Sequence, residues 1–76
     1  MKKFNIMLNT VEDAEEFVNA AAKCDFEIDL YGGSVALDAK SLLGVLTMGI
    51  KRDLEVVAQK NDPAFFQTAK KFVVAA

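Results

Sequence analysis

The chain has 76 residues, a net charge of −2 at neutral pH and a pI near 4.9. Its composition is 53% hydrophobic and 26% charged, which is typical of a packed domain with a small core and excludes a disordered chain. Its mild acidity leaves no basic footprint for nucleic acid, and no apolar run approaches the roughly 18 residues of a membrane span. We therefore expect one cytoplasmic domain over residues 1–76, without nucleic-acid or membrane partners.

The absence of histidine restricts the chemistry of the chain further. It excludes histidine general bases, Ser–His and Cys–His dyads, histidine metal ligands and phosphohistidine chemistry. The one cysteine cannot form an internal disulfide, and with scattered carboxylates it does not make a plausible zinc site. We therefore expect no metal or other cofactor, and a protein that is not an enzyme.

The first strand and the first helix are predicted from their apolar spacing. Residues 3–8 alternate as in a half-buried strand, with Phe4, Ile6 and Leu8 on one face. Asn9 or Thr10 then provides a helix N-cap, and residues 10–13 approximate a capping box with aspartate in place of glutamate. The buried stripe of this helix is expected to be Ala14, Phe17, Val18 and Ala21.

Two strands joined by a hairpin turn follow. Phe26, Ile28 and Leu30 alternate with polar residues and predict a second strand. Gly32-Gly33 is expected to form a two-residue turn, because glycine adopts positive φ without steric penalty. A third strand then continues through residues 35–37.

The second half of the chain adds a helix, a strand and a last helix. Ser41 stands where an N-cap belongs, before a short helix from Leu42 to about Ile50, and residues 54–58 alternate as a fourth strand. Asp62 is the expected N-cap of the last helix and Pro63 its first residue. The buried side of that helix is expected to be Phe65, Phe66, Ala69, Phe72 and Val73. The order βαββαβα predicts an α+β fold with helices over one face of a mainly antiparallel sheet.

The segment Lys40-Ser41-Leu42-Leu43-Gly44-Val45-Leu46-Thr47-Met48-Gly49-Ile50 resembles the HPr family, the small phosphocarrier proteins of the bacterial sugar phosphotransferase system. That family has a lysine–serine pair, two apolar residues, a glycine and further apolar residues at this place in the βαββαβα order. The resemblance extends back through residues 28–30 and the helix from Phe17 to Asp25, and forward to the final helix. It implies an HPr-like open-faced sandwich, a four-stranded antiparallel sheet with three helices on one face.

The resemblance stops at the segment that carries the family's working histidine. In the family a T-G-x-H-A-R-P-A segment lies between the first strand and the first helix. The corresponding loop here, Asn9 to Asp13, is a few residues shorter, so the histidine and its neighbouring glycine, arginine and proline have no counterparts. Residues 12–16 instead contain four carboxylates, which stabilise a helix start as solvated charges and repel a phosphate dianion. We expect no catalytic residue and no phosphotransfer in this loop.

Ser41 has two compatible interpretations. The residue type indicates a helix N-cap, worth about 1 kcal/mol. In Gram-positive members of the family, the serine of the lysine–serine pair is phosphorylated by a dedicated kinase, so the resemblance implies that Ser41 is a regulatory phosphorylation site with Lys40 beside it. A cap hydroxyl exposed at a helix start remains accessible, and both roles can hold together.

The helix over residues 42–50 carries more apolar residues than one buried stripe requires. Leu43, Leu46 and Ile50 share one side, and the other apolar residues fall off that line, so part of this surface is expected to be exposed as a partner site. The resemblance implies that Leu42, Leu43 and Leu46 form the family's apolar docking patch for partner proteins, and we expect Lys40 to bind the partner together with them. The alternative is a short helix buried nearly all round.

Cys24 is the other candidate for reactivity. We expect a buried, inert thiol, because no cation or helix N-terminus is predicted beside it to lower its pKa.

Two functions of different classes follow from the sequence. The first is an HPr-like protein without histidine phosphotransfer that regulates or binds protein partners through the Ser41 helix, with a serine kinase or a carbon-regulation protein as candidate partner. The second is a small interaction module unrelated to sugar transport that self-associates through Leu42, Leu43 and Leu46. The identity of the partner and the oligomeric state are left open.

Overall fold

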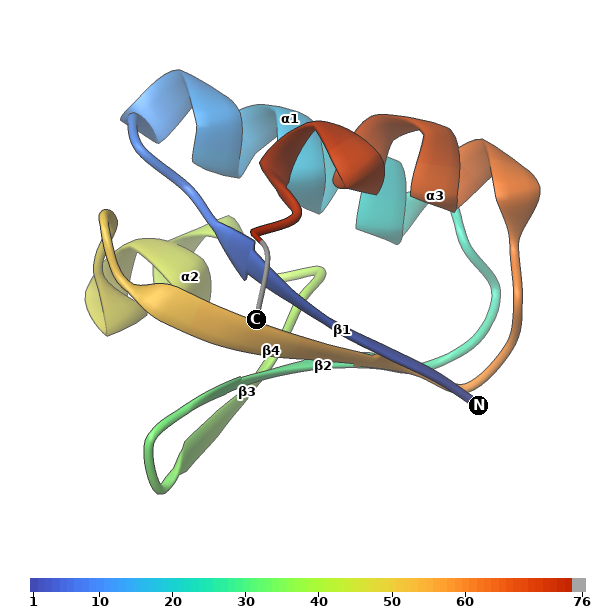
Figure 1. Cartoon of the computed structure of the whole chain (residues 1–76), viewed down its shortest axis with the longest axis horizontal. Helices are drawn as coiled ribbons and strands as arrows, with labels where there is room; N and C mark the ends of the chain where they lie inside the picture. The colour runs from blue at the N-terminus through green and yellow to red at the C-terminus, as the bar shows by residue number, and fades with distance from the viewer. Residues whose placement is uncertain (75–76) are drawn as a thin grey trace.

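The computed structural model describes residues 1–74 of the chain, and it confirms the expected order of elements. Figure 1 shows the path of the chain through them. The elements are β1 (Lys2–Met7), α1 (Val11–Ala22), β2 (Ile28–Gly32), β3 (Val35–Asp38), α2 (Leu42–Met48), β4 (Asp53–Ala58), α3 (Pro63–Ala69) and a 3₁₀ turn, η1 (Lys70–Phe72).

The strands form one antiparallel sheet in the order β1-β4-β2-β3. One row of paired residues runs from Phe4 through Val56 and Leu30 to Leu37, and these side chains face the helices. Figure 1 shows α1 and α3 lying together over this face, while α2 packs beside α1 and next to β3. The expected α+β fold, a four-stranded antiparallel sheet with three helices, is confirmed.

The core lies between the sheet and the helices. All four residues expected on the inner stripe of α1 are buried, and Phe17 is fully buried. Its ring meets those of Phe65 and Phe72 edge-on, with centroids 5.7 Å and 6.5 Å away, which joins α1 to α3. The largest fully buried side chains are Phe17, Ile6, Leu8, Ile28, Leu30, Leu54, Val45 and Val56.

Each helix begins at a capping side chain. The Thr10 hydroxyl accepts a hydrogen bond from the Asp13 amide at 3.0 Å, and the Asp62 carboxylate accepts from the amides of Ala64 and Phe65. The Asp13 carboxylate accepts from the amide of Asn9, one residue before the cap, so the reciprocal bond of a standard capping box is displaced by one residue.

The expected Gly32-Gly33 turn is wrong by one residue. Gly32 pairs with Val35 inside the sheet, and the turn residues are Gly33 and Ser34, with positive φ (+63°) only at Gly33. Gly32 instead packs against the end of α2, because a Cβ there would lie 2.6 Å from the Met48 sulfur and the Met48 side chain would have to move. This glycine lets the end of α2 approach the hairpin.

The expected end of the second helix is also wrong. α2 ends at Met48, and Gly49 follows with φ of +103°, so Ile50 lies outside the helix. Gly49 adopts a conformation that other residues rarely reach, which stops the helix two residues early. The Arg52 guanidinium then donates to the Met48 carbonyl at 3.0 Å, satisfying one of the free carbonyls of the last turn.

Two apolar residues depart from the expected buried set near the C-terminal end. Phe66 is half-buried, and its ring meets Phe4 edge-on at 5.3 Å. Val73 is 41% exposed; it follows η1 and forms an isolated backbone bridge with Ile6 of the edge strand β1. In the N-terminal half, Phe26 is half-buried but precedes β2 rather than belonging to it.

Candidate partner-binding site

Ser41 is the N-cap of α2, as its position in the sequence predicted. Its backbone is extended, with φ of −103° and ψ of 107°, and its hydroxyl accepts a hydrogen bond from the Gly44 amide at 3.2 Å. The residue is exposed. The cap therefore leaves the hydroxyl at the protein surface.

Lys40 is held by two hydrogen bonds just before this cap. Its amide donates to the Asp38 carboxylate at 2.9 Å, and its ammonium donates to the backbone carbonyl of Cys24 at 2.8 Å. Cys24 lies just after α1, so the lysine joins the start of α2 to the end of α1. In this conformation Lys40 has a structural role, and its ammonium is engaged within the protein.

The apolar residues of α2 divide into three classes of exposure. Val45 and Met48 are buried in the core, and Leu42 and Leu46 are half-buried against it. Leu43 is 78% exposed, the largest exposed fraction among the large apolar side chains of residues 1–74. The expectation that part of this helix is exposed is confirmed for Leu43.

The side of α2 next to α1 can be assigned from neighbouring contacts. A Cβ on Gly44 would meet the Leu37 side chain at 3.7 Å, so the Gly44 side faces β3. Leu42 and Leu46, one turn apart, lie on the opposite side of the buried stripe. That side faces α1, which packs against α2.

The side of α1 next to α2 follows from its ion pair. Glu16 pairs with Lys71 of η1, so the Glu16 flank faces the C-terminal helical segment. Val11 and Glu15, at helical spacing i and i+4, lie on the other flank, beside α2. Val11 is 46% exposed and Glu15 is exposed. We call Val11, Glu15, Leu42, Leu43 and Leu46, together with the exposed Glu12 on the outer side of α1 next to Val11, the α1–α2 surface.

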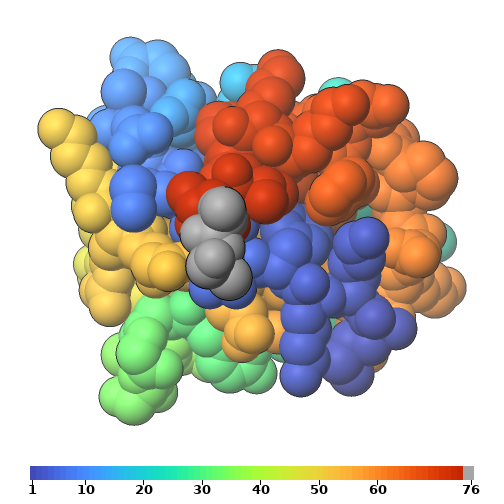
Figure 2. Space-filling model, viewed as in Figure 1, coloured from blue at the N-terminus to red at the C-terminus, as the bar shows by residue number. Residues whose placement is uncertain are grey.

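One cation at the edge of this surface was missed in the sequence. The amide of Lys51 donates to the carbonyl of Leu8 at 2.6 Å, which joins the loop after α2 to the segment before α1. Figure 2 shows these two segments side by side at one edge of the molecule. Lys51 has φ of +62°, unusual for a residue with a side chain, and it is exposed. Gly49, two residues before Lys51, was the only sequence signal of this bend.

Cys24 has the buried thiol that was expected, but its surroundings differ. Its sulfur lies 3.8 Å from the carboxylate of Asp62, the N-cap of α3, so a helix N-terminus is adjacent after all. Burial raises the pKa of the thiol, and the negative charge of Asp62 raises this pKa further, against a smaller opposing effect of Lys40. The capping carboxylate thus offsets the effect that a bare helix N-terminus would have on the thiolate.

Other site chemistry is limited in the part of the chain that the structure describes. Within residues 1–74, no three acidic or cysteine side chains gather so as to hold a metal ion. In the same residues, every helix is too short or too polar to cross a membrane.

The fold and this surface allow comparison with known proteins. The family model described as "PTS HPr component phosphorylation site" matches residues 11–74. This chain belongs to the HPr family. HPr-family proteins are phosphocarriers that interact with other proteins of the phosphotransferase system.

Two solved structures of HPr proteins have the same fold. The HPr-C-His structure from Thermoanaerobacter tengcongensis aligns with a TM-score of 0.76 at 20% identity, over 93% of each chain. The phosphocarrier protein HPr from Bacillus anthracis str. Ames aligns with a TM-score of 0.74 at 16% identity, over 93% of this chain and 95% of that one. No curated protein matches the chain. The HPr fold predicted from the Ser41 segment is thereby confirmed.

Proposed function

We propose that this HPr-family chain does not transfer phosphoryl groups through histidine, and that it regulates or binds partner proteins through α2. The observation that carries the proposal is the exposure of Leu43, which is 78% exposed two residues after the exposed hydroxyl of Ser41. A large apolar side chain left in water beside a modifiable hydroxyl supports recognition of this helix start by another protein.

The loss of phosphocarrier chemistry is supported by the segment between β1 and α1. The sequence has no histidine, and the Thr10 hydroxyl at the start of α1 is engaged in capping. Glu12, Glu15 and Glu16 surround this helix start with exposed negative charge. An approaching phosphoryl group would be repelled there, and we propose that the chain is neither a phosphocarrier nor an enzyme.

Phosphorylation of Ser41 by a serine kinase is the regulatory event we propose. The hydroxyl is exposed at the start of α2, where the helix dipole favours negative charge. Asp38 lies nearby and opposes it, because its carboxylate accepts from the amide of Lys40, the residue before Ser41. Because the helix dipole favours the phosphate and the Asp38 carboxylate opposes it, we expect phosphorylation to leave the structure of α2 largely unchanged. It would mainly alter the charge that a partner meets.

The proposal is tested by the intact mass of the protein after incubation with ATP and the serine kinase of the HPr family. One phosphoryl adduct is expected, and it should be absent in Ser41→Asn, which keeps a capping side chain but removes the hydroxyl. Ser34→Ala, which changes an exposed serine in the hairpin turn, should keep the adduct. An unmodified wild-type chain, beside a modified histidine-containing HPr, would refute Ser41 as the regulatory site.

The exposed Leu43 also supports a second candidate, self-association through Leu42, Leu43 and Leu46. Sedimentation velocity over a range of concentrations tests it. A dimer that Leu43→Ser converts to monomer would support self-association, and a monomer at all concentrations would exclude it.

A further inference from the structure

The α1–α2 surface combines apolar side chains with unpaired carboxylates. Val11 and Leu43 are exposed on its two helices, and Leu42 and Leu46 form its half-buried floor. Residues 11–22 contain four carboxylates and no lysine or arginine. The surface is thus an apolar strip with an acidic border along α1.

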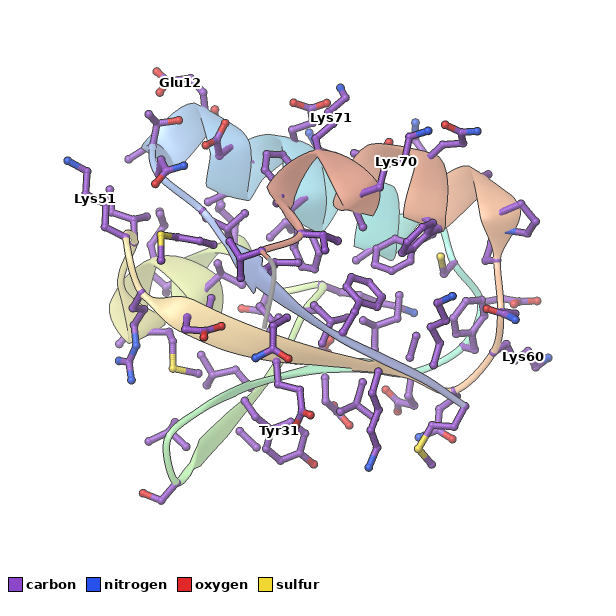
Figure 3. All side chains as sticks on the ribbon, in the orientation of Figure 1. Glu12, Tyr31, Lys51, Lys60, Lys70 and Lys71 are labelled. Carbon is purple, nitrogen blue, oxygen red and sulfur yellow. The ribbon has the colours of Figure 1, made fainter. Side chains whose placement is uncertain are left out.

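Two of the four carboxylates on α1 are already engaged. Glu16 forms an ion pair with Lys71, and Asp13 accepts the amide of Asn9. Within residues 1–74, neither Glu12 nor Glu15 has a hydrogen bond or an ion pair through its carboxylate. Figure 3 shows Glu12 at the start of α1, directed away from the rest of the molecule. These two charges remain available to a partner.

The nearby cations do not neutralise this border. The ammonium of Lys40 is bonded to the Cys24 carbonyl, and Arg52 is bonded to the Met48 carbonyl at the far end of α2. Lys51 is exposed at the edge of the surface, where its amide donates to the Leu8 carbonyl before α1, and it contributes one positive charge there. Against this one cation, the two carboxylates of Glu12 and Glu15 leave the surface with a net negative charge.

We propose that the partner of the α1–α2 surface is a basic amphipathic segment, with apolar side chains that cover Leu43 and Val11 and with lysine or arginine side chains that meet Glu12 and Glu15. This inference rests on the proposed function and specifies the chemistry of its partner. Lysine and arginine stems add apolar contact while their charged ends reach the carboxylates. Complementary charge sets the orientation and the association rate of such a complex.

The same charges disfavour a second copy of this chain as the occupant. In a two-fold symmetric dimer, the α1–α2 surface of one copy would contact the α1–α2 surface of the other copy. Glu12 and Glu15 of one copy would then approach those of the other, and like charges in a partly desolvated contact are repulsive. An acidic partner meets the same repulsion.

The inference is tested with two designed helical peptides. One arranges leucine and lysine in amphipathic order, and the other has glutamate in place of each lysine. Binding to the full chain is measured by fluorescence anisotropy at about 0.1 M salt, where charges more than roughly 10 Å apart are largely screened. The lysine peptide is expected to bind more tightly, and its amide chemical-shift changes are expected to concentrate on α1 and α2.

Matched variants separate local recognition from net charge. Glu12→Gln with Glu15→Gln should weaken binding of the lysine peptide about fivefold, the effect of two exposed ion pairs. The control, Glu27→Gln with Glu55→Gln, removes the same charge from the residue before β2 and from β4, outside the α1–α2 surface, and should change binding by less than about 1.5-fold. Glu12→Lys with Glu15→Lys should reverse the preference to the glutamate peptide.

Four outcomes would overturn the inference, and they have different meanings. Equal weakening by both Gln pairs would show attraction to net charge only. Tighter binding of the glutamate peptide to the wild-type chain would contradict the assigned partner chemistry. If Leu43→Ser loses binding while both Gln double variants bind as tightly as the wild type, a basic partner would be refuted, and the surface and the proposed function would stand. If Leu43→Ser also has no effect, the surface itself fails, and the proposed function with it.

Discussion

The ammonium of Lys40 donates a hydrogen bond to the backbone carbonyl of Cys24 at 2.8 Å, and this contact joins the start of α2 to the end of α1. The two helices bound the α1–α2 surface, so the contact fixes the relation between Leu43 and the carboxylates of α1. A lysine in the recognisable Lys40-Ser41 pair thus contributes to the geometry of the site through the fold.

Lys40→Met should therefore destabilise the protein. It keeps most of the apolar stem but leaves the Cys24 carbonyl without its charged donor, and we expect a loss of about 1 kcal/mol in the free energy of unfolding. Lys60→Met is the control, because Lys60 is exposed and its ammonium has no hydrogen bond or ion pair within residues 1–74. Urea denaturation measures both, and equal stability of the two variants would contradict the role of Lys40.

Gly32→Ala should also destabilise the protein, by about 1–3 kcal/mol, because overpacking displaces a side chain or the backbone. The added Cβ would lie 2.6 Å from the Met48 sulfur, at the end of α2. Combining it with Met48→Ala should cost less than the sum of the two single changes, because the second removes the clash of the first. Additive losses in thermal denaturation would show that the two residues are not coupled.

The cap at Ser41 gives a third prediction, separable from phosphorylation. Ser41→Ala should lower the free energy of unfolding by about 1 kcal/mol, whereas Ser41→Asn should change it little. The reason is that asparagine can still accept the Gly44 amide that the serine hydroxyl now accepts at 3.2 Å. Chemical denaturation of the unphosphorylated variants checks this order, and equal losses in both would contradict a capping role.

The raised pKa of Cys24 gives a prediction for pH dependence. Burial and the Asp62 carboxylate hold the folded thiol protonated at pH values where the unfolded thiol ionises. The contribution of this group to stability is therefore complete below the ordinary thiol pKa, about 8.5, and declines as the pH rises above it. Between pH 7.5 and about pH 10, the wild type should lose unfolding free energy relative to Cys24→Ala. A difference independent of pH would contradict the raised pKa.

The fold was predictable from the sequence where the signal is local. The cap residues Ser41 and Asp62 were recognised, and Thr10 was one of two candidates with Asn9, because a capping side chain bonds to amides within its own turn. The stripe through Phe17 was recognised because its spacing alone defines a buried helix face.

The remaining features depend on contacts between distant segments. Gly32 was interpreted as a turn residue because its actual constraint, Met48, lies far along the chain. The bond of Lys40 to Cys24 and the positive φ of Lys51 depend likewise on how α2 meets α1 and β1. At the candidate site the exposure of Leu43 was foreseen only as part of a wider patch, because the periodicity of a seven-residue helix does not determine which flank packs on its neighbour.

The central claim is that a protein partner binds the exposed side of α2 and recognises Ser41 and Leu43 together. The most direct measurement is the initial rate at which the serine kinase of the HPr family phosphorylates wild type, Leu43→Ser and Val35→Ser. Val35 is 51% exposed on β3, outside the α1–α2 surface, and serves as the matched control. We predict a rate about tenfold lower for Leu43→Ser, consistent with loss of one buried leucine contact, and an unchanged rate for Val35→Ser. Equal rates in all three proteins, or no phosphorylation of any of them, would contradict the account.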